Sequence, residues 1–323
     1  MRTRIVVACG AAIFAAIIVN FQYSGGPGVH TDFGMVWFGA RAALAGRNPY
    51  ELIGPGREFD YTWNLLYPMP ALVAVVPLSI LREQLAATVF VTVSAGLLAF
   101  GMTRDNLRLL PMLVTEAFVS SCRLGQWSLI VTASLFFPLL GVLTAVKPQS
   151  TIPILVSSRW KKSWVAAIVG SVLLLTLSFV VQPHWIDSWM HNVLTSSSMK
   201  PPVARFGGFL ILLVLIRWRR PESWLIATFA CLPQSVGWYG TLPLLTVPGS
   251  LIESLILAGT SALGVYFGGY FMPDSKSLND VFDWAGGVVV LTVYLPAVIM
   301  VLRRTNESVP PVWLERVVRK YKK

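Results

Sequence analysis

Long hydrophobic runs alternate with short polar stretches over almost the whole chain. Many of these runs approach twenty residues, the length that an α-helix needs to cross roughly 30 Å of hydrocarbon. The pattern predicts an all-α polytopic membrane protein with about 10–12 transmembrane helices. Residues 126–158 form either two helices, the second very short, or one long broken helix. The expected crossings lie at about 4–23, 65–81, 84–101, 107–122, 126–158, 163–181, 206–217, 223–238, 240–249, 251–271 and 285–302.

Basic clusters and long polar stretches predict which ends of these helices share a compartment. Clusters of lysine and arginine mark cytoplasmic loops, which here are 159–162, 217–220 and 303–304. The expected external loops are about 24–64, 182–205 and 272–284. Both termini then lie in the cytoplasm, and the protein belongs in the cytoplasmic (inner) membrane.

The same pattern predicts one transmembrane domain over 1–302 and a basic cytoplasmic tail over 303–323. The inward helix at 65–81 is expected to end in a tight inner turn at Leu81-Arg82-Glu83. No internal repeat is evident, which disfavours the transporter folds built from inverted repeats.

The stretch 30–50, which follows the first hydrophobic run, predicts a short amphipathic helix beside the membrane. Thr31 can cap its start, apolar residues then follow at spacings of four, three and four, and Gly46 ends it. Asp32 falls in the first helical turn, where the helix dipole favours a negative charge. Asp32 is therefore either a residue that only stabilises the helix start or an ionised group available for chemistry.

Composition and charge fit this membrane interpretation. Hydrophobic residues make up 55% of the chain and charged residues only 13%, about half the usual share in soluble domains. The net charge of +11 is concentrated in the short clusters between hydrophobic runs, so we expect contact with anionic membrane lipids and no nucleic-acid partner. Cys9, Cys122 and Cys231 all lie inside apolar segments, which predicts neither a disulfide framework nor a metal site.

Ionisable residues are scarce inside the hydrophobic runs, where only Glu116, Lys147 and Glu253 occur. Channels and proton-coupled carriers usually place several charges in mid-membrane. The polar residues gather instead in the external loops above a helical base. This distribution favours an enzyme that acts on a lipid-anchored substrate at the outer interface.

Several motifs, taken in order, resemble glycosyltransferase family 87. The first is DFGMVWFGARAALAGRNPY at 32–50, and the second is the helix start Tyr67-Pro68-Met69-Pro70. Gly125-Gln126 before an apolar helix and then Lys147-Pro148 complete the series. The resemblance covers roughly residues 1–160, and more loosely continues to about 250. It implies a GT-C-like helical bundle and a membrane glycosyltransferase of the mannosyltransferase type.

The resemblance also implies a reaction and its partners. A hexose, expected to be mannose, would pass with inversion from a polyprenyl-phosphate-sugar donor to a lipid-linked or cell-envelope glycan acceptor. Such a reaction needs a base for the acceptor hydroxyl and cationic donors around the leaving phosphate. The external loops hold no convincing metal-ligand spacing, so we expect no metal, and we expect no other cofactor.

Asp32 matches the acid in the family's first loop and is the expected general base. Arg41, Arg47 and Lys147 are the expected contacts of the donor phosphate. Arg41 lies nine residues after Asp32, about 900° of helix, so it faces away from Asp32. The candidate accessory residues are Gln126, His30, His184, His191, Asp60 and Tyr61.

Two other functions stay open on the sequence alone. The chain is short for the family, and the interval from Gly125-Gln126 to Lys147-Pro148 is compressed. A catalytically degenerate member that acts as an assembly partner is therefore one alternative. The other is a transporter or flippase of a lipid-linked glycan, which more polar residues within the helices would have favoured.

Overall fold

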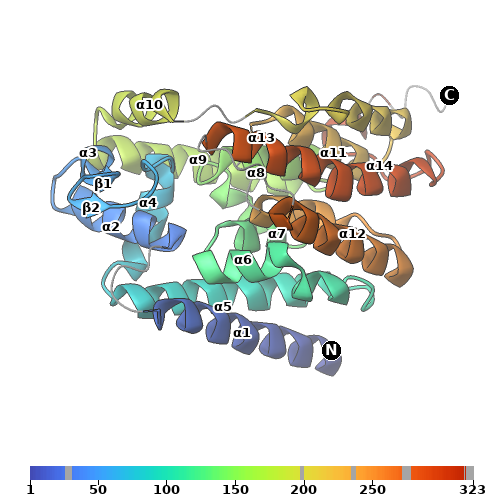
Figure 1. The fold of residues 1–323 in the computed structure, drawn as a ribbon, viewed down its shortest axis with the longest axis horizontal. Helices are drawn as coiled ribbons and strands as arrows, with labels where there is room; N and C mark the ends of the chain where they lie inside the picture. The colour runs from blue at the N-terminus through green and yellow to red at the C-terminus, as the bar shows by residue number, and fades with distance from the viewer. Residues whose placement is uncertain (26–30, 197–199, 234–237, 271–277, 316, 318–323) are drawn as a thin grey trace.

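The computed structural model describes the chain except for residues 26–30, 197–199, 234–237, 271–277, 316 and 318–323. The described part is mostly helical, and its two strands, β1 (Ile53–Gly54) and β2 (Phe59–Asp60), pair in parallel over two residues each. The N-terminus lies at one end of the bundle (Figure 1). The opposite end carries the strands together with α3 (Pro49–Leu52) and α10 (Trp185–Thr195).

Within the described chain, five helices are long and apolar enough to cross a membrane. They are α1 (Arg2–Tyr23), α5 (Glu83–Met102), α9 (Lys161–Val181), α12 (Leu251–Tyr270) and the continuous helix α13–η7–α14 (Leu278–Val289, Val290–Tyr294, Leu295–Leu302). Large apolar side chains such as Ile17 and Val172 stay more than half exposed on these helices, as lipid contact requires. The protein is an all-α membrane protein.

The remaining hydrophobic runs fold into shorter pieces. Prolines stand in the first turns of several of them and prevent the preceding segment from continuing as helix. A helix of ten residues rises only about 15 Å, half of a bilayer core, so the described part has fewer full-length crossings than the 10–12 expected. The short pieces are α4 (Met69–Val75), η1 (Val76–Leu78), η2 (Leu110–Val114), α6 (Glu116–Leu124), α7 (Ser128–Ala133), η3 (Pro138–Leu143), α8 (Pro148–Ser157), η5 (Gly208–Arg217), α11 (Pro221–Cys231) and η6 (Trp238–Thr246).

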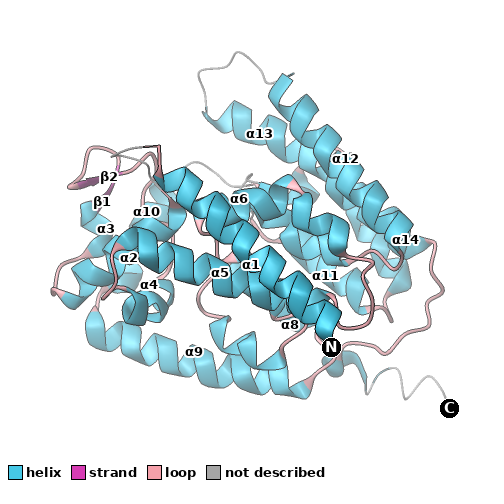
Figure 2. Ribbon diagram, turned by 90° about the horizontal axis from the view of Figure 1, so that it is seen from below, coloured by secondary structure: helices cyan, strands magenta, loops and turns pink. Residues whose placement is uncertain are grey.

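The predicted inward crossing at 65–81 is wrong. Helices α1 and α5 run antiparallel, since Tyr23 Oη donates to Glu83 Oε1 at 2.9 Å and Arg4 Nη2 donates to the Phe100 carbonyl at 3.0 Å. Figure 2 shows α1 lying along α5. Glu83 therefore lies at the same end as Tyr23, and α4 with η1 stays at that end. Prolines on both sides leave this run only ten residues of helix, too few to reach the other face.

Two polar segments far apart in sequence meet at the end that carries α10, which we call the loop end (residues 31–82 and α10). Asn192 Nδ2 donates to the Tyr50 carbonyl at 3.1 Å, and Trp189 Nε1 donates to the Leu66 carbonyl at 2.9 Å. The second polar loop, 182–205, thus contains a helix that the sequence did not predict. Of the third expected loop, 272–284, residues 272–277 fall outside the described residues, and residues 278–284 are not loop but the first part of α13.

Helix α2 (Asp32–Leu44) has nearly the predicted bounds but different surroundings. Its side chains from Phe33 to Ala43 are buried at nine positions around the helix, and Arg41 and Leu44 are among its exposed residues. The expected surface helix is therefore enclosed by protein, chiefly by α4, α3 and α5. This enclosure fixes its first turn in place.

The basic clusters gather at the opposite end, which we call the basic end (Arg159, Arg217–Arg220 and Arg303–Arg304). Arg217 Nη2 donates to the Leu302 carbonyl at 2.8 Å. Beyond it, the Val312 amide donates to the Ser158 carbonyl at 3.0 Å. The start of the expected tail therefore packs against the bundle, and it contains the short helix η8 (Val312–Leu314).

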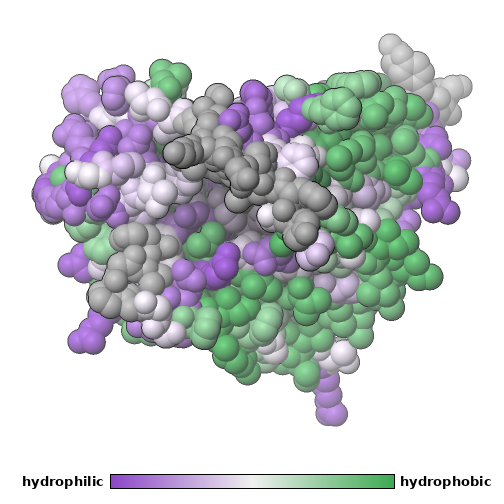
Figure 3. Space-filling view, in the orientation of Figure 1, coloured by the Kyte–Doolittle hydropathy of each residue, from purple (hydrophilic) through white to green (hydrophobic). Residues whose placement is uncertain are grey.

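The surface divides along the same axis. Figure 3 shows hydrophilic side chains over the loop end at the left, hydrophobic side chains over the middle and right, and a narrow hydrophilic rim at the far right. An apolar band between two polar ends is the surface that a membrane-embedded protein presents.

Candidate functional site

The first turn of α2 carries Asp32 and is held from two sides. Thr31 Oγ1 accepts a hydrogen bond from the Gly34 amide at 3.0 Å, which caps the helix. On the other side, Gly125 at the end of α6 has φ +65°, and a Cβ built there would lie 2.5 Å from Phe33 Cβ. Only glycine permits both this backbone conformation and this approach. The contact places Gln126, the next residue, beside the start of α2.

Gln126 joins two other segments through one atom. Its Oε1 accepts a hydrogen bond from Tyr67 Oη at 3.0 Å and another from Lys147 Nζ at 3.0 Å. Gln126 is fully buried, and only 5% of Lys147 is exposed. A buried ammonium group is costly unless it has a partner, so the Gln126 carbonyl is what allows Lys147 to lie here.

Two tyrosine rings flank the lysine. Lys147 Nζ lies 5.8 Å from the ring centroid of Tyr67 and 5.2 Å from that of Tyr239. A cation over the face of an aromatic ring is attracted to its π electrons. Three segments distant in sequence, which carry Tyr67, Gln126 and Tyr239, thus converge on Lys147.

The charges of Asp32 and Lys147 act on each other. Burial raises the pKa of the Asp32 carboxyl to about 6, and the Lys147 charge opposes this rise. Burial likewise lowers the pKa of Lys147 to about 8, and the Asp32 charge opposes that fall. Both groups are therefore charged near neutral pH, and a carboxylate with a pKa near the working pH is suited to act as a general base.

Asp32 and Gln126 keep unused hydrogen-bonding groups. Asp32 has no hydrogen-bond or ion-pair partner within the described part of the chain and keeps some accessible surface. Gln126 Nε2 is likewise buried without a partner among the described residues. We call these residues with Tyr67, Lys147 and Tyr239 the Asp32 recess. Buried polar groups without a partner call for an explanation, and a bound polar ligand is one such explanation.

Behind Asp32 lies a polar cluster that the sequence analysis missed. Tyr23 Oη donates to Glu83 Oε1 and lies 3.0 Å from Thr31 Oγ1. A Cβ built at Gly34 would lie 2.5 Å from Glu83 Oε1 and 2.6 Å from Tyr61 Oη. Tyr61 thus supports the start of α2 from behind. Glu83 was missed because the expected inner turn put it at the wrong end.

The other predicted site residues lie away from the recess. Arg41 is exposed and stacks over its own helix neighbour Trp37 at 4.8 Å. Arg47 forms a surface ion pair with Glu58. Asp60 Oδ1 accepts from the Gly56 amide in a turn at 2.8 Å.

The candidate histidines also lie outside the recess. His184 and His191 are exposed, at the start and in the second half of α10, and His30 falls outside the described residues. Of the predicted residues, Asp32, Gln126 and Lys147 are the ones that the structure brings together.

Tyr67 and Tyr239 are the recess residues that the sequence analysis did not select. Tyr67 had a signal, because it opens the Tyr-Pro-Met-Pro helix start. Tyr239 had no such signal, since it follows an apolar segment whose pattern predicts an ordinary membrane crossing. Residues of the described chain form no cluster of three or more metal-ligating side chains, and the expectation of no metal and no cofactor stays a prediction.

No protein-family model, no curated protein and no solved structure matches this chain. The expected membership of glycosyltransferase family 87 therefore stays a prediction.

The Gln126 carboxamide can be tested through stability. Replacing Gln126 with Leu removes the acceptor of Lys147 Nζ and Tyr67 Oη, and we expect a loss of about 1–3 kcal/mol in the free energy of unfolding. Gln126→Glu keeps an acceptor for both donors and should retain most of the stability. Thermal unfolding in a neutral detergent measures both variants. Equal stability of Gln126→Leu and the wild type would show that the hydrogen bonds to Oε1 do not hold Lys147.

Proposed function

We propose that the protein transfers a sugar from a polyprenyl-phosphate carrier to a hydroxyl group, in the Asp32 recess. The observation that carries the proposal is the convergence of a carboxylate with a pKa near 6 and a buried ammonium group. Asp32 belongs to the loop end, and Lys147 lies over the ring of Tyr67, which belongs to the same end. A base beside a cation is what an acceptor hydroxyl and a leaving phosphate require.

The reaction follows from these two groups. The acceptor hydroxyl gives its proton to the Asp32 carboxylate as its oxygen forms a bond to C1 of the sugar. The bond from C1 to the phosphate oxygen breaks, and its electron pair stays on that oxygen. Lys147 stabilises the charge that develops on the leaving polyprenyl phosphate. The nucleophile enters opposite the leaving group, so the configuration at C1 inverts.

The remaining recess residues fit the roles of positioning groups. The unpartnered Gln126 Nε2 offers N–H donors to a sugar hydroxyl or a phosphate oxygen. Tyr67 and Tyr239 hold the Lys147 ammonium between them. Gln126 therefore both fixes Lys147 and faces the ligand.

The membrane orientation extends this proposal. Basic clusters mark the cytoplasmic side, so the basic end with both termini lies in the cytoplasm and the loop end faces outward. The enzyme then acts at the outer face of the cytoplasmic membrane, where a carrier lipid presents its head group. A GT-C-like bundle, a mannose donor and a lipid-linked or cell-envelope glycan acceptor are the finer parts of the proposal, supported by the motif series from Asp32 to Lys147.

The sequence predicts three contacts for the donor phosphate, Arg41, Arg47 and Lys147. In this proposal Lys147 alone contacts it. Arg41 and Arg47 lie on the exposed side of the loop end. They are suited to contact neighbouring lipid phosphates.

Asp32→Asn should abolish transfer. The variant keeps the shape of the side chain but cannot accept the hydroxyl proton, so we expect a rate loss of about 100-fold or more. The measurement is sugar transfer from labelled polyprenyl-phosphate-mannose in membranes that contain the variant. Asp187→Asn is the matched control, because Asp187 is an exposed acid in the first turn of α10.

Transfer by Asp32→Asn at the wild-type rate would contradict the base assignment. Translocation of the labelled lipid in proteoliposomes without a new glycosidic bond would instead support the flippase alternative.

The pH profile of transfer should be bell-shaped. The raised pKa of Asp32 means that the base is protonated below about pH 6, so the rate falls on the acid side. The lowered pKa of Lys147 means that the cation is lost above about pH 8, so the rate falls on the alkaline side. Initial rates between pH 5 and 9 at constant ionic strength test this. A rate at pH 5 equal to the rate at pH 7 would exclude Asp32 as the base.

A further inference from the structure

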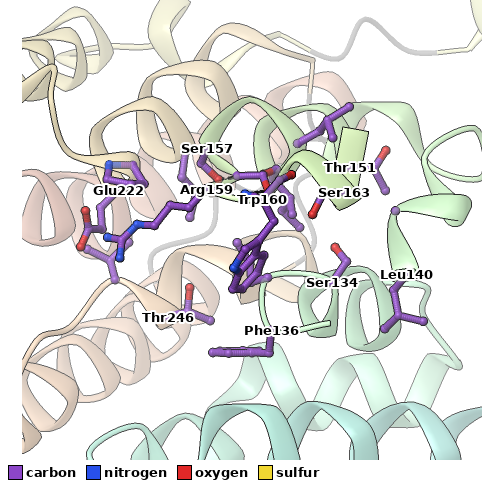
Figure 4. Close-up of a pocket in the computed structure, with 18 of the residues that line it drawn as sticks. Ser134, Phe136, Leu140, Thr151, Ser157, Arg159, Trp160, Ser163, Glu222 and Thr246 are labelled. Carbon is purple, nitrogen blue, oxygen red and sulfur yellow. Dashed lines mark hydrogen bonds between the residues drawn. The ribbon is translucent and has the colours of Figure 1, made fainter. Parts of the chain in front are cut away.

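A cavity of about 410 Å³ opens at the basic end, away from the Asp32 recess. It lies between the loop after α5, the α7–η3 region, the α8–α9 junction, α11 and η6. Figure 4 shows Trp160 at its centre, with Ser134 and Ser163 on one side and Thr246 on the other. A volume of this size is typical of small-molecule sites, and none of the recess residues lines it.

The charged lining of the cavity is mainly basic. Arg104, Arg108 and Arg159 line it from two separate loops. Arg108 Nε donates a hydrogen bond to the Pro248 carbonyl at 3.2 Å, and Arg159 Nη2 donates one to Ser308 Oγ at 3.4 Å. The guanidinium groups therefore keep unused N–H donors, and arginine side chains are the preferred ligands of phosphate groups.

The acids of the lining do not cancel this charge. Glu222 lies 3.7 Å from Arg304 and 4.0 Å from Arg220, two arginines that do not line the cavity. Asp105 is the other acid of the lining and forms no ion pair within the described chain. Three arginines thus face one unpaired carboxylate.

The inner wall adds a polar group that lacks a partner. Ser163 is 95% buried, and its hydroxyl has no hydrogen bond among the described residues. Ser163 lines the cavity near Ser134 on the wall shown in Figure 4. A buried hydroxyl without a partner in the wall of a cavity calls for an explanation, and an acceptor group of a bound ligand supplies one.

The rest of the wall is apolar. Phe136, Leu140, Leu155 and Val247 line the cavity together with the Trp160 ring. A ligand that fits both the basic part and the apolar part of the lining has an anionic head and an apolar chain. We infer that this cavity binds a phosphate-bearing amphiphile, with its phosphate against Arg104, Arg108 and Arg159 and its chain along the apolar wall. The inference does not depend on the sugar transfer proposed for the Asp32 recess.

Trp160 provides a local readout of binding. A phosphatidic acid with brominated acyl chains, added to the full-length protein in a neutral detergent, should quench tryptophan fluorescence with saturation. Trp160→Phe should remove most of this saturable component, because quenching by bromine falls off steeply with distance and Trp160 lies at the centre of the cavity. Brominated diacylglycerol lacks the phosphate and should not produce it. Inorganic phosphate should not displace the brominated lipid at comparable concentrations, because it lacks the chain.

A matched pair of variants tests the charges. Arg104→Ala/Arg159→Ala should weaken binding about tenfold or more, because it removes two charge-assisted phosphate contacts. Lys161→Ala/Lys162→Ala removes the same charge from exposed residues at the same end that do not line the cavity, and should leave binding unchanged.

Three results would overturn the inference. The first is equal weakening by the two double variants, which would indicate only general attraction of the lipid to the basic end. The second is equal quenching by brominated diacylglycerol, which would remove the role of the phosphate. The third is displacement of the brominated phosphatidic acid by inorganic phosphate at comparable concentrations, which would remove the role of the apolar wall.

Discussion

A buried ammonium group needs a fixed partner, and the hydrogen bond from Lys147 Nζ to Gln126 Oε1 meets that need in this protein. The same oxygen accepts from Tyr67 Oη, so one carboxamide links the α8 start, the α4 approach and the end of α6. The α6 end in turn packs on α2 through Gly125. The position of Asp32 opposite Lys147 depends on this chain of contacts, because each element alone is too short to hold its own orientation in a membrane.

The sequence predicted the parts of the structure that local chemistry controls. The Thr31 cap sets the start of α2, and the long hydrophobic runs become the five full-length helices of the described chain. The motif series predicts Asp32, Gln126 and Lys147 as site residues, and the structure brings these three together. Tyr239 and Glu83 could not be chosen, because their roles come from contacts between distant segments. The predicted crossing at 65–81 was wrong because the segment is hydrophobic enough to cross a membrane, but its prolines limit the helix to a length that cannot span it.

The two ends of the molecule carry different groups of polar and charged side chains. At the loop end, two polar segments far apart in sequence are joined by hydrogen bonds from α10, and the Asp32 carboxylate and the Lys147 ammonium shift each other's pKa values. At the basic end, arginines surround a cavity with an apolar wall. Short helices between the full-length ones make both sites possible, because a helix that ends inside the bundle leaves polar side chains and free volume there.

A structure determined with a non-reactive polyprenyl-phosphate-sugar analogue tests the central claim most directly. The account predicts the phosphate within hydrogen-bond distance of Lys147 Nζ, and the sugar between that phosphate and the Asp32 carboxylate, on the outward side of Gln126. A phosphate bound instead at Arg41 or Arg47, with Asp32 remote from the sugar, would contradict it.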